Sequence, residues 1–161
     1  MTPSTPLRVL SFDVRASRFG FAMFEGPDEL LDWGVKNFRN GVNAVKVPAS
    51  KKIPSLLSEL RPHVVVIEKS LPRENSPLVG TITRLARKQN VPVRPVSRAA
   101  VRKRFAHQKQ NKHAIAMILS RRFPELAERL PPKRKAWQSE DYRMSIFDAV
   151  ALGLTHFGRQ S

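Results

Sequence analysis

The 161-residue sequence contains no cysteine, no long apolar run and few acidic residues, and each shortage narrows its possible functions. Without cysteine, the chain can form neither a disulfide nor a thiolate zinc site, and a reducing compartment is expected. No apolar run approaches the roughly 18 residues of a membrane helix, and MTPSTPLRVL lacks the apolar core of a signal peptide. We therefore expect a soluble cytoplasmic protein, associated with the nucleoid if the source is bacterial.

What the sequence does contain is an excess of positive charge, concentrated in its middle segment. The chain has 29 Lys and Arg against 13 Asp and Glu, a net charge of +16. Residues 69–135 alone carry 18 basic and 3 acidic residues, so almost the whole excess lies there. A basic face of this kind favours a polyanion such as nucleic acid. A solvated basic surface or a ribosomal-type RNA binder is the alternative, and no amphipathic basic helix suggests a membrane partner.

Hydrophobic periodicity predicts one α/β domain spanning residues 1–161, without a linker or repeat. The expected strands are 7–13, 20–25, 31–38, 63–68 and 91–96, and the expected helices are 43–60, 76–90, 98–105, 112–123 and 139–157. The short connections between the first strands predict a three-stranded antiparallel meander. Residues 63–68 (HVVVIE) contain four consecutive β-branched residues, which is typical of a buried strand in a parallel sheet.

Acidic residues stand at the ends of the two clearest strands. Asp13 closes LRVLSFD, and Glu68 closes HVVVIE. If these strands are parallel neighbours, both carboxylates emerge at one edge of the sheet. In the last helix, Asp141, Ser145 and Asp148 are expected to share a face, at positions i, i+4 and i+7. Clustered carboxylates repel unless a cation neutralises them, and oxygen ligands without cysteine favour Mg²⁺ or Mn²⁺.

Each acid also has a purely structural interpretation. A strand-terminal Asp such as Asp13 often only caps a turn. Glu140 and Asp141 follow Ser139, so they are also the acids favoured at a helix N-terminus. Asp148 is harder to explain in this way, because it lies within the apolar stretch SIFDAVALGL. An acid in such surroundings normally has a charged partner or a metal.

The same residues resemble a known family. RVLSFDVRASRFGFAMF is similar to the opening hairpin of the RuvC-type Holliday junction resolvases, within the RNase H-like superfamily, and VVVIEKS is similar to their second motif. RAAVRKRFAHQKQNKHAIAMIL resembles their basic segment, with Lys112 at the motif lysine, and FDAVALGLTH resembles their C-terminal motif. The resemblance covers nearly the whole chain and implies an RNase H-like fold: a mixed five-stranded sheet of a three-stranded antiparallel meander plus parallel strands, flanked by helices.

For function, the resemblance implies a homodimeric endonuclease that cleaves branched DNA in recombination and repair, using two Mg²⁺ or Mn²⁺ ions. Asp13, Glu68 and Asp148 would be metal ligands, with Asp141 assisting and Lys112 holding the scissile phosphate. Phosphate contacts are expected from a basic set: Arg94, Arg98, Arg102, Lys103, Arg104, Lys109 and Lys112. Trp137, beside a basic run, is a candidate for base stacking, whereas Trp33 is expected in the core.

The sequence also departs from the family pattern. Resolvases carry a further Asp three residues before the last acid, where this chain has Ser145. Asp141 or Glu140 is the candidate replacement. Leu71 stands where resolvases often place an aromatic residue, and HQKQN (107–111) replaces a glycine-rich loop. DYRMS (141–145) is faintly similar to the YqgF-type relatives, so an RNA-processing nuclease and an inactive nucleic-acid-binding protein of the same fold remain alternatives.

Overall fold

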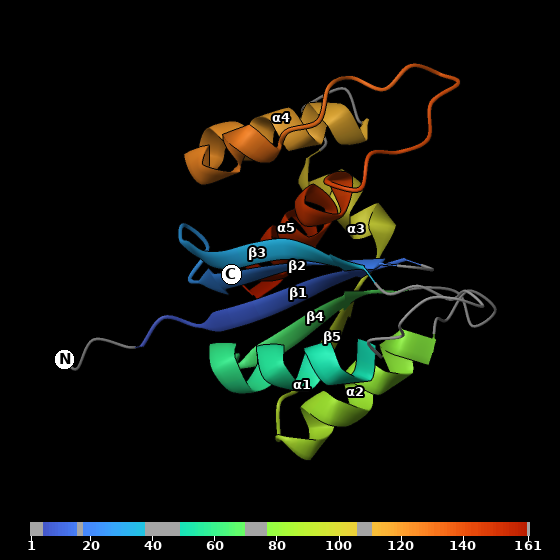
Figure 1. Ribbon diagram of the computed structural model, residues 1–161. Coiled ribbons are helices and arrows are strands. Elements are labelled where there is room, and N and C mark those ends of the chain that lie inside the picture. The colour runs from blue at the N-terminus through green and yellow to red at the C-terminus, as the bar shows by residue number, and fades with distance from the viewer. Residues whose placement is uncertain (1–4, 16–17, 38–48, 70–76, 106–110, 161) are drawn as a thin grey trace, which may run out of the picture.

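A five-stranded sheet lies at the centre of the computed structural model, which describes residues 5–15, 18–37, 49–69, 77–105 and 111–160 (Figure 1). The strands are β1 (Arg8–Val14), β2 (Arg18–Glu25), β3 (Leu30–Asn37), β4 (Val64–Glu68) and β5 (Val93–Val96). Their order is β3-β2-β1-β4-β5. The pairs β1–β2 and β2–β3 are antiparallel, whereas β1–β4 and β4–β5 are parallel. The predicted combination of a meander with parallel strands is confirmed.

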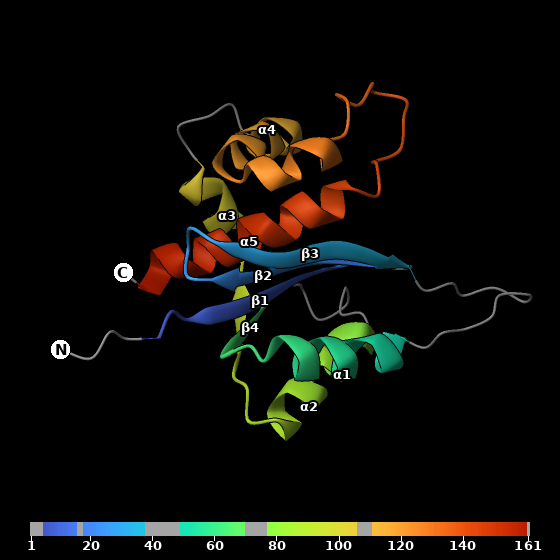
Figure 2. The same ribbon diagram turned by 60° about the vertical axis from the view of Figure 1, so that its left-hand side comes forward.

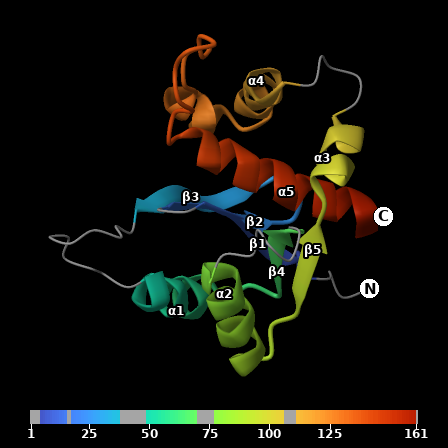
Figure 3. The same cartoon turned by 90° about the vertical axis from the view of Figure 1, so that its right-hand side faces the viewer.

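Helices cover both faces of this sheet. They are α1 (Ala49–Leu60), α2 (Pro77–Lys88), α3 (Arg98–Arg104), α4 (Lys112–Arg122) and α5 (Met144–Gln160), and a short 3-10 helix, η2 (Pro124–Arg129), follows α4. Helices α1 and α2 lie on one face, and α3, α4 and α5 lie on the other (Figures 2 and 3). Within the described ranges, no helix is both long and apolar enough to cross a membrane.

The alternation of side chains along β1 decides which residues face α5. Leu10 and Phe12 point toward α1 and α2 and are fully buried in the core on that face. Val9 packs on the opposite face, against α5. Ser11 is buried on that face too, and its hydroxyl donates a 2.6 Å hydrogen bond to the carbonyl oxygen of Ala149 in α5. Because side chains alternate with a period of two, Asp13 also faces α5.

Glycine allows α5 to approach the sheet closely. A Cβ atom at Gly20 in β2 would overlap the backbone carbonyl of Ser145 and lie 2.7 Å from the Ser145 Cβ. A Cβ atom at Gly153 in α5 would lie 2.9 Å from Cδ2 of the buried Phe24 ring. Real Cβ atoms do not approach this closely, so both positions require glycine as long as the helix stays where it is. The depth at which α5 sits fixes the distance between its side chains and β1.

Two details differ from the sequence-based expectation. Helix α5 begins at Met144 rather than near Ser139, so the predicted shared helix face of Asp141, Ser145 and Asp148 is wrong. The 3-10 helix η2 was not predicted. On α2, Leu78 and Ile82 are buried in the core beneath the sheet, so this apolar face of the helix packs within the chain.

Candidate active site

The strand-end acids and α5 meet at a cavity of about 170 Å³. Its polar lining consists of Asp13, Glu68, Arg98, Arg102, Lys112 and Asp148, and apolar side chains of α3, α4 and α5 complete it. A water molecule takes up roughly 30 Å³ in the liquid, so the cavity has room for several waters or a phosphate group. The three acids that the sequence singled out most strongly therefore line the same cavity.

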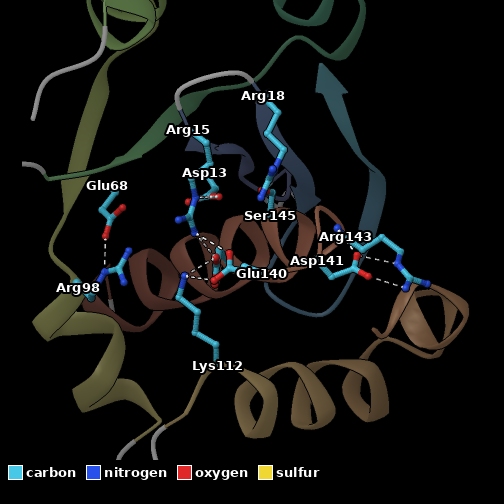
Figure 4. Close-up of polar contacts among 11 residues, drawn as sticks. Asp13, Arg15, Arg18, Glu68, Arg98, Lys112, Glu140, Asp141, Arg143 and Ser145 are labelled. Atoms are coloured by element: carbon cyan, nitrogen blue, oxygen red, sulfur yellow. Dashed lines mark hydrogen bonds and ion pairs between the residues drawn. The ribbon is translucent and has the colours of Figure 1, made fainter. Parts of the chain in front are cut away.

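The parallel pairing of β1 with β4 brings the first two acids together. Phe12 is the register partner of Ile67, so the next residues, Asp13 and Glu68, are neighbours at the carboxyl ends of their strands. Asp13 is 1% exposed. Glu68 is more open, with a side chain 27% exposed, and its Oε1 accepts a 2.9 Å hydrogen bond from Nε of Arg98. Figure 4 shows that this pair lies apart from the cluster around Asp13.

The cluster around Asp13 is held by an arginine that sequence analysis did not single out. Arg15 follows β1, and its Nε donates to Oδ2 of Asp13 at 2.9 Å. Its Nη2 donates to Oδ2 of Asp148 at 2.6 Å. The same Nη2 lies 3.4 Å from Oε1 of Glu140, which is labelled beside Arg15 in Figure 4. One guanidinium thus contacts three carboxylates that come from three different parts of the chain. No local pattern around Arg15 indicates this, because two of its partners are distant in sequence.

Lys112 is the second cation of this cluster. It is the first residue of α4, a position set by Asn111, whose side-chain oxygen caps the helix by accepting from the Ala114 N–H at 2.7 Å. The Lys112 Nζ lies 3.1 Å from Oδ2 of Asp148 and 3.2 Å from Oε2 of Glu140. The lysine named from the sequence is therefore in direct contact with the acids.

Burial disfavours the ionised forms of Asp13 and Asp148, even though Arg15 and Lys112 contact these acids. Desolvation raises the pKa of Asp13 to about 6, and the nearby charge of Asp148 adds to this effect. Arg15 opposes the rise but does not cancel it. Desolvation also raises the pKa of Asp148, against the lowering effect of Lys112 and Arg15. An additional cation would stabilise the ionised form of either carboxylate, because the pKa of both is raised.

Asp141 lies outside this cluster. Its carboxylate accepts from the backbone N–H of Arg143 and forms two hydrogen bonds of 2.8–2.9 Å with the Arg143 guanidinium. The hydrogen bond and charge of Arg143 lower the pKa of Asp141. Asp141 therefore pairs with Arg143 just before α5, whereas Glu140 points into the cluster (Figure 4). The sequence had left open which of these two acids joins the site. Ser145 is buried, and its hydroxyl accepts from Nε of Arg18 at 3.3 Å.

The basic residues expected to contact phosphate lie mainly on α3 and on the preceding strand, β5. Arg94, Arg98, Arg102, Lys103 and Arg104 are all exposed. Ser97 caps α3 by accepting from the backbone N–H of Ala100 at 3.0 Å. Arg98 and Arg102 line the cavity itself, so a basic helix adjoins the acids. Lys109 and Leu71 lie outside the described residues.

The acids supply the oxygen donors that hard divalent cations prefer, and Glu140 adds a buried Oε1 with no hydrogen-bond partner among the described residues. Asp13, Glu68, Asp148 and Glu140 are thus the residues able to hold a metal. In the described part of the chain, however, no three acids or histidines are grouped closely enough to ligate one ion. Arg15 and Lys112 lie between the carboxylates.

Together, fold and site define an α/β protein with an acidic cluster where two central parallel strands end, covered by a C-terminal helix and edged by a basic one. Among solved structures, the chain is similar to Thermus thermophilus RuvC in complex with a Holliday junction substrate, at 18% identity and a TM-score of 0.66, covering 96% of this chain and 95% of that one. It is also similar to the Fowlpox virus resolvase in complex with Holliday junction DNA, at 15% identity and a TM-score of 0.58, covering 96% and 99%.

These likenesses show the fold. The chain has the RNase H-like fold of the RuvC-type resolvases, as the motifs in its sequence indicated. A comparison with protein-family models found no match. A comparison with curated proteins found none either.

Proposed function

We propose that this chain is a divalent-cation-dependent endonuclease that cleaves the phosphodiester backbone of branched DNA, in the manner of a Holliday junction resolvase. The observation that carries the proposal is the convergence of Asp13, Glu68 and Asp148 on one cavity that Lys112 and a basic helix also line. The fold supports it further, because two similar structures were solved with Holliday junction DNA.

The residues divide into two groups with different tasks. Arg98 and Arg102 would hold the phosphates of the strand, and Lys112 would bind the phosphate at the point of cleavage. Asp13, Glu68 and Asp148 would supply the oxygen ligands for divalent cations, and Glu140 would take the assisting role first considered for Asp141. A cation bound there would activate water and stabilise the charge that develops on the phosphate. The reaction forms one bond from the water oxygen to phosphorus and breaks one ester bond.

Branched DNA is favoured over duplex DNA by the nucleic acids in the similar structures. A four-way junction has four strands, and its symmetric resolution cuts two opposed strands, which requires two active sites. We therefore propose that the chain acts as a homodimer. A YqgF-like RNA-processing nuclease would use the same cavity and differ in substrate.

A nucleic-acid-binding protein without catalytic activity is a second candidate. The observation in its favour is the ion pairing of Arg15 and Lys112 with the acids, since these contacts neutralise carboxylates without any metal. Such a protein would bind DNA through the same basic helix but would not cleave it with any divalent ion.

Cleavage assays separate these candidates. Labelled four-way junction, linear duplex and structured RNA are each incubated with the protein in Mg²⁺, in Mn²⁺ and in EDTA. We expect metal-dependent cleavage of the junction, and a loss of about 10³-fold in Asp13→Asn, because a metal ligand contributes several kcal/mol in the transition state. Asp28→Asn is the matched control, since its side chain is 89% exposed on the loop after β2.

Each alternative outcome has its own meaning. Preferential cleavage of RNA would favour the RNA-processing nuclease. Tight junction binding without cleavage under any metal condition would favour the inactive binding protein. Full activity in Asp13→Asn would refute the role of the cavity acids.

A further inference from the structure

Arg15 has a fixed position at the centre of the acidic cluster. Its backbone N–H donates a 2.8 Å hydrogen bond to the carbonyl oxygen of Arg18, which ties it to the beginning of β2. From there its guanidinium contacts Asp13, Asp148 and Glu140 at 2.6–3.4 Å (Figure 4). These are the carboxylates that the proposed function assigns to cation binding, so a protein cation lies between residues that would otherwise flank a metal.

The cations that contact the carboxylates are unevenly distributed. Arg15 and Lys112 both contact the same oxygen of Asp148, Oδ2, and both also contact Glu140. Among the ion pairs of the described residues, Asp13 has Arg15 as its one cationic partner and Glu68 has Arg98. Asp13 and Glu68 come from neighbouring parallel strands, line the same cavity, and each keep one oxygen without a hydrogen bond or ion pair to the described residues. Two cations therefore neutralise the side of the cluster near Asp148, whereas the side toward Glu68 is less fully neutralised.

The net charge of the cluster also favours one divalent cation over two. Asp13, Asp148 and Glu140 contribute −3, and Arg15 and Lys112 contribute +2, which leaves −1. Glu68 and Arg98 cancel each other. One divalent cation and one phosphodiester group, −1 + 2 − 1, bring the cluster to zero. A second divalent cation would leave +2 in a largely buried site, which is costly where water is excluded.

We propose that the guanidinium of Arg15 takes the place of one of the two divalent cations expected from the sequence, so that the chain binds a single ion at Asp13 and Glu68. This proposal rests on the proposed function, because it concerns the same acids. Arg15 supplies permanent positive charge between Asp13 and Asp148, two of the acids that the proposed function assigns to cation binding. Arg15 is a positioning residue in this account, because it keeps both carboxylates in place before any metal binds.

The number of Mn²⁺ ions bound tests the proposal without relying on activity. Titration calorimetry, with electron paramagnetic resonance to count free Mn²⁺, is carried out on the full chain and on three variants. We expect one ion per chain for the parent and two for Arg15→Gln, in which the cation is removed. Arg15→Lys retains the positive charge and should bind one ion. Arg18→Gln is the matched control and should also bind one, because Arg18 contacts Ser145 rather than the cluster.

The outcomes separate the two proposals. Two ions bound by the parent chain would show that Arg15 moves aside, which overturns its role but leaves metal-dependent cleavage intact. A single ion in a folded Arg15→Gln, with folding checked by circular dichroism, would also overturn it. If Arg15→Gln does not fold, two ions bound by Arg15→Lys would overturn the proposal, and one would support it. No Mn²⁺ bound by any form, together with cleavage in EDTA, would refute the metal dependence of the proposed function itself.

Discussion

Replacing Asp13 by asparagine is expected to stabilise the metal-free protein even though it removes a proposed metal ligand. Burial raises the pKa of Asp13 from 3.8 to about 6. The folded chain therefore holds this proton more tightly than the unfolded chain, so the free energy of unfolding falls as pH rises between these two values. At 1.36 kcal/mol per pKa unit, ionised Asp13 costs the folded state about 3 kcal/mol. Asparagine, being neutral, avoids this cost.

Urea denaturation in EDTA measures the effect. At about pH 7.5, Asp13→Asn should unfold with a free energy up to about 3 kcal/mol higher than the parent, equivalent to roughly 6–12 °C in Tm for a chain of this size. At about pH 3.5 the difference should shrink to a few tenths of a kcal/mol, because Asp13 is then protonated in the folded state and mostly protonated in the unfolded state. Adding Mn²⁺ should stabilise the parent more than the variant, since the ion binds only the folded state.

Asp28→Asn again provides the control, with an expected change within about 0.5 kcal/mol because its side chain is exposed. If Asp13→Asn were less stable than the parent at pH 7.5, the ion pair with Arg15 would outweigh desolvation. The account of Asp13 as an under-stabilised buried carboxylate would then be wrong.

Three further predictions concern the basic helix α3, the packing of α5 against the sheet, and the exposed Trp137. Arg102→Glu should make the dependence of log DNA affinity on log salt shallower by at least about 1, and an unchanged slope would place α3 away from the DNA. In urea titrations, Gly20→Ala should lower the free energy of unfolding by about 1–3 kcal/mol, because the added methyl group displaces α5. Gly80→Ala should raise it by about 0.5–1 kcal/mol, because Gly80 lies within a helix and has open space around it. Trp137 is 77% exposed, so its fluorescence, isolated in Trp33→Phe, should be quenched by DNA with unpaired bases; no quenching would argue against stacking.

Much of the fold was predictable because its signals are local. Runs of β-branched residues, prolines at the last strand and short connections predicted all five strands, and the structure confirms them. Trp33 packs against the core as expected. The start of α5 was mispredicted because acids near a helix N-terminus are compatible with positions inside or before the helix. Asp141 lies before it, bonded to Arg143.

The sequence alone determined the class of fold, the basic middle segment and the positions of the two strand-end acids, because each depends on residues close together in the chain. Only the tertiary structure showed that Glu140 rather than Asp141 joins the cluster, and that Arg15 pairs with acids up to 133 residues away. Such contacts depend on how deeply α5 sits against the sheet, which is decided by packing at Gly20 and Gly153. That depth follows from three-dimensional packing across the whole domain, which no local pattern encodes.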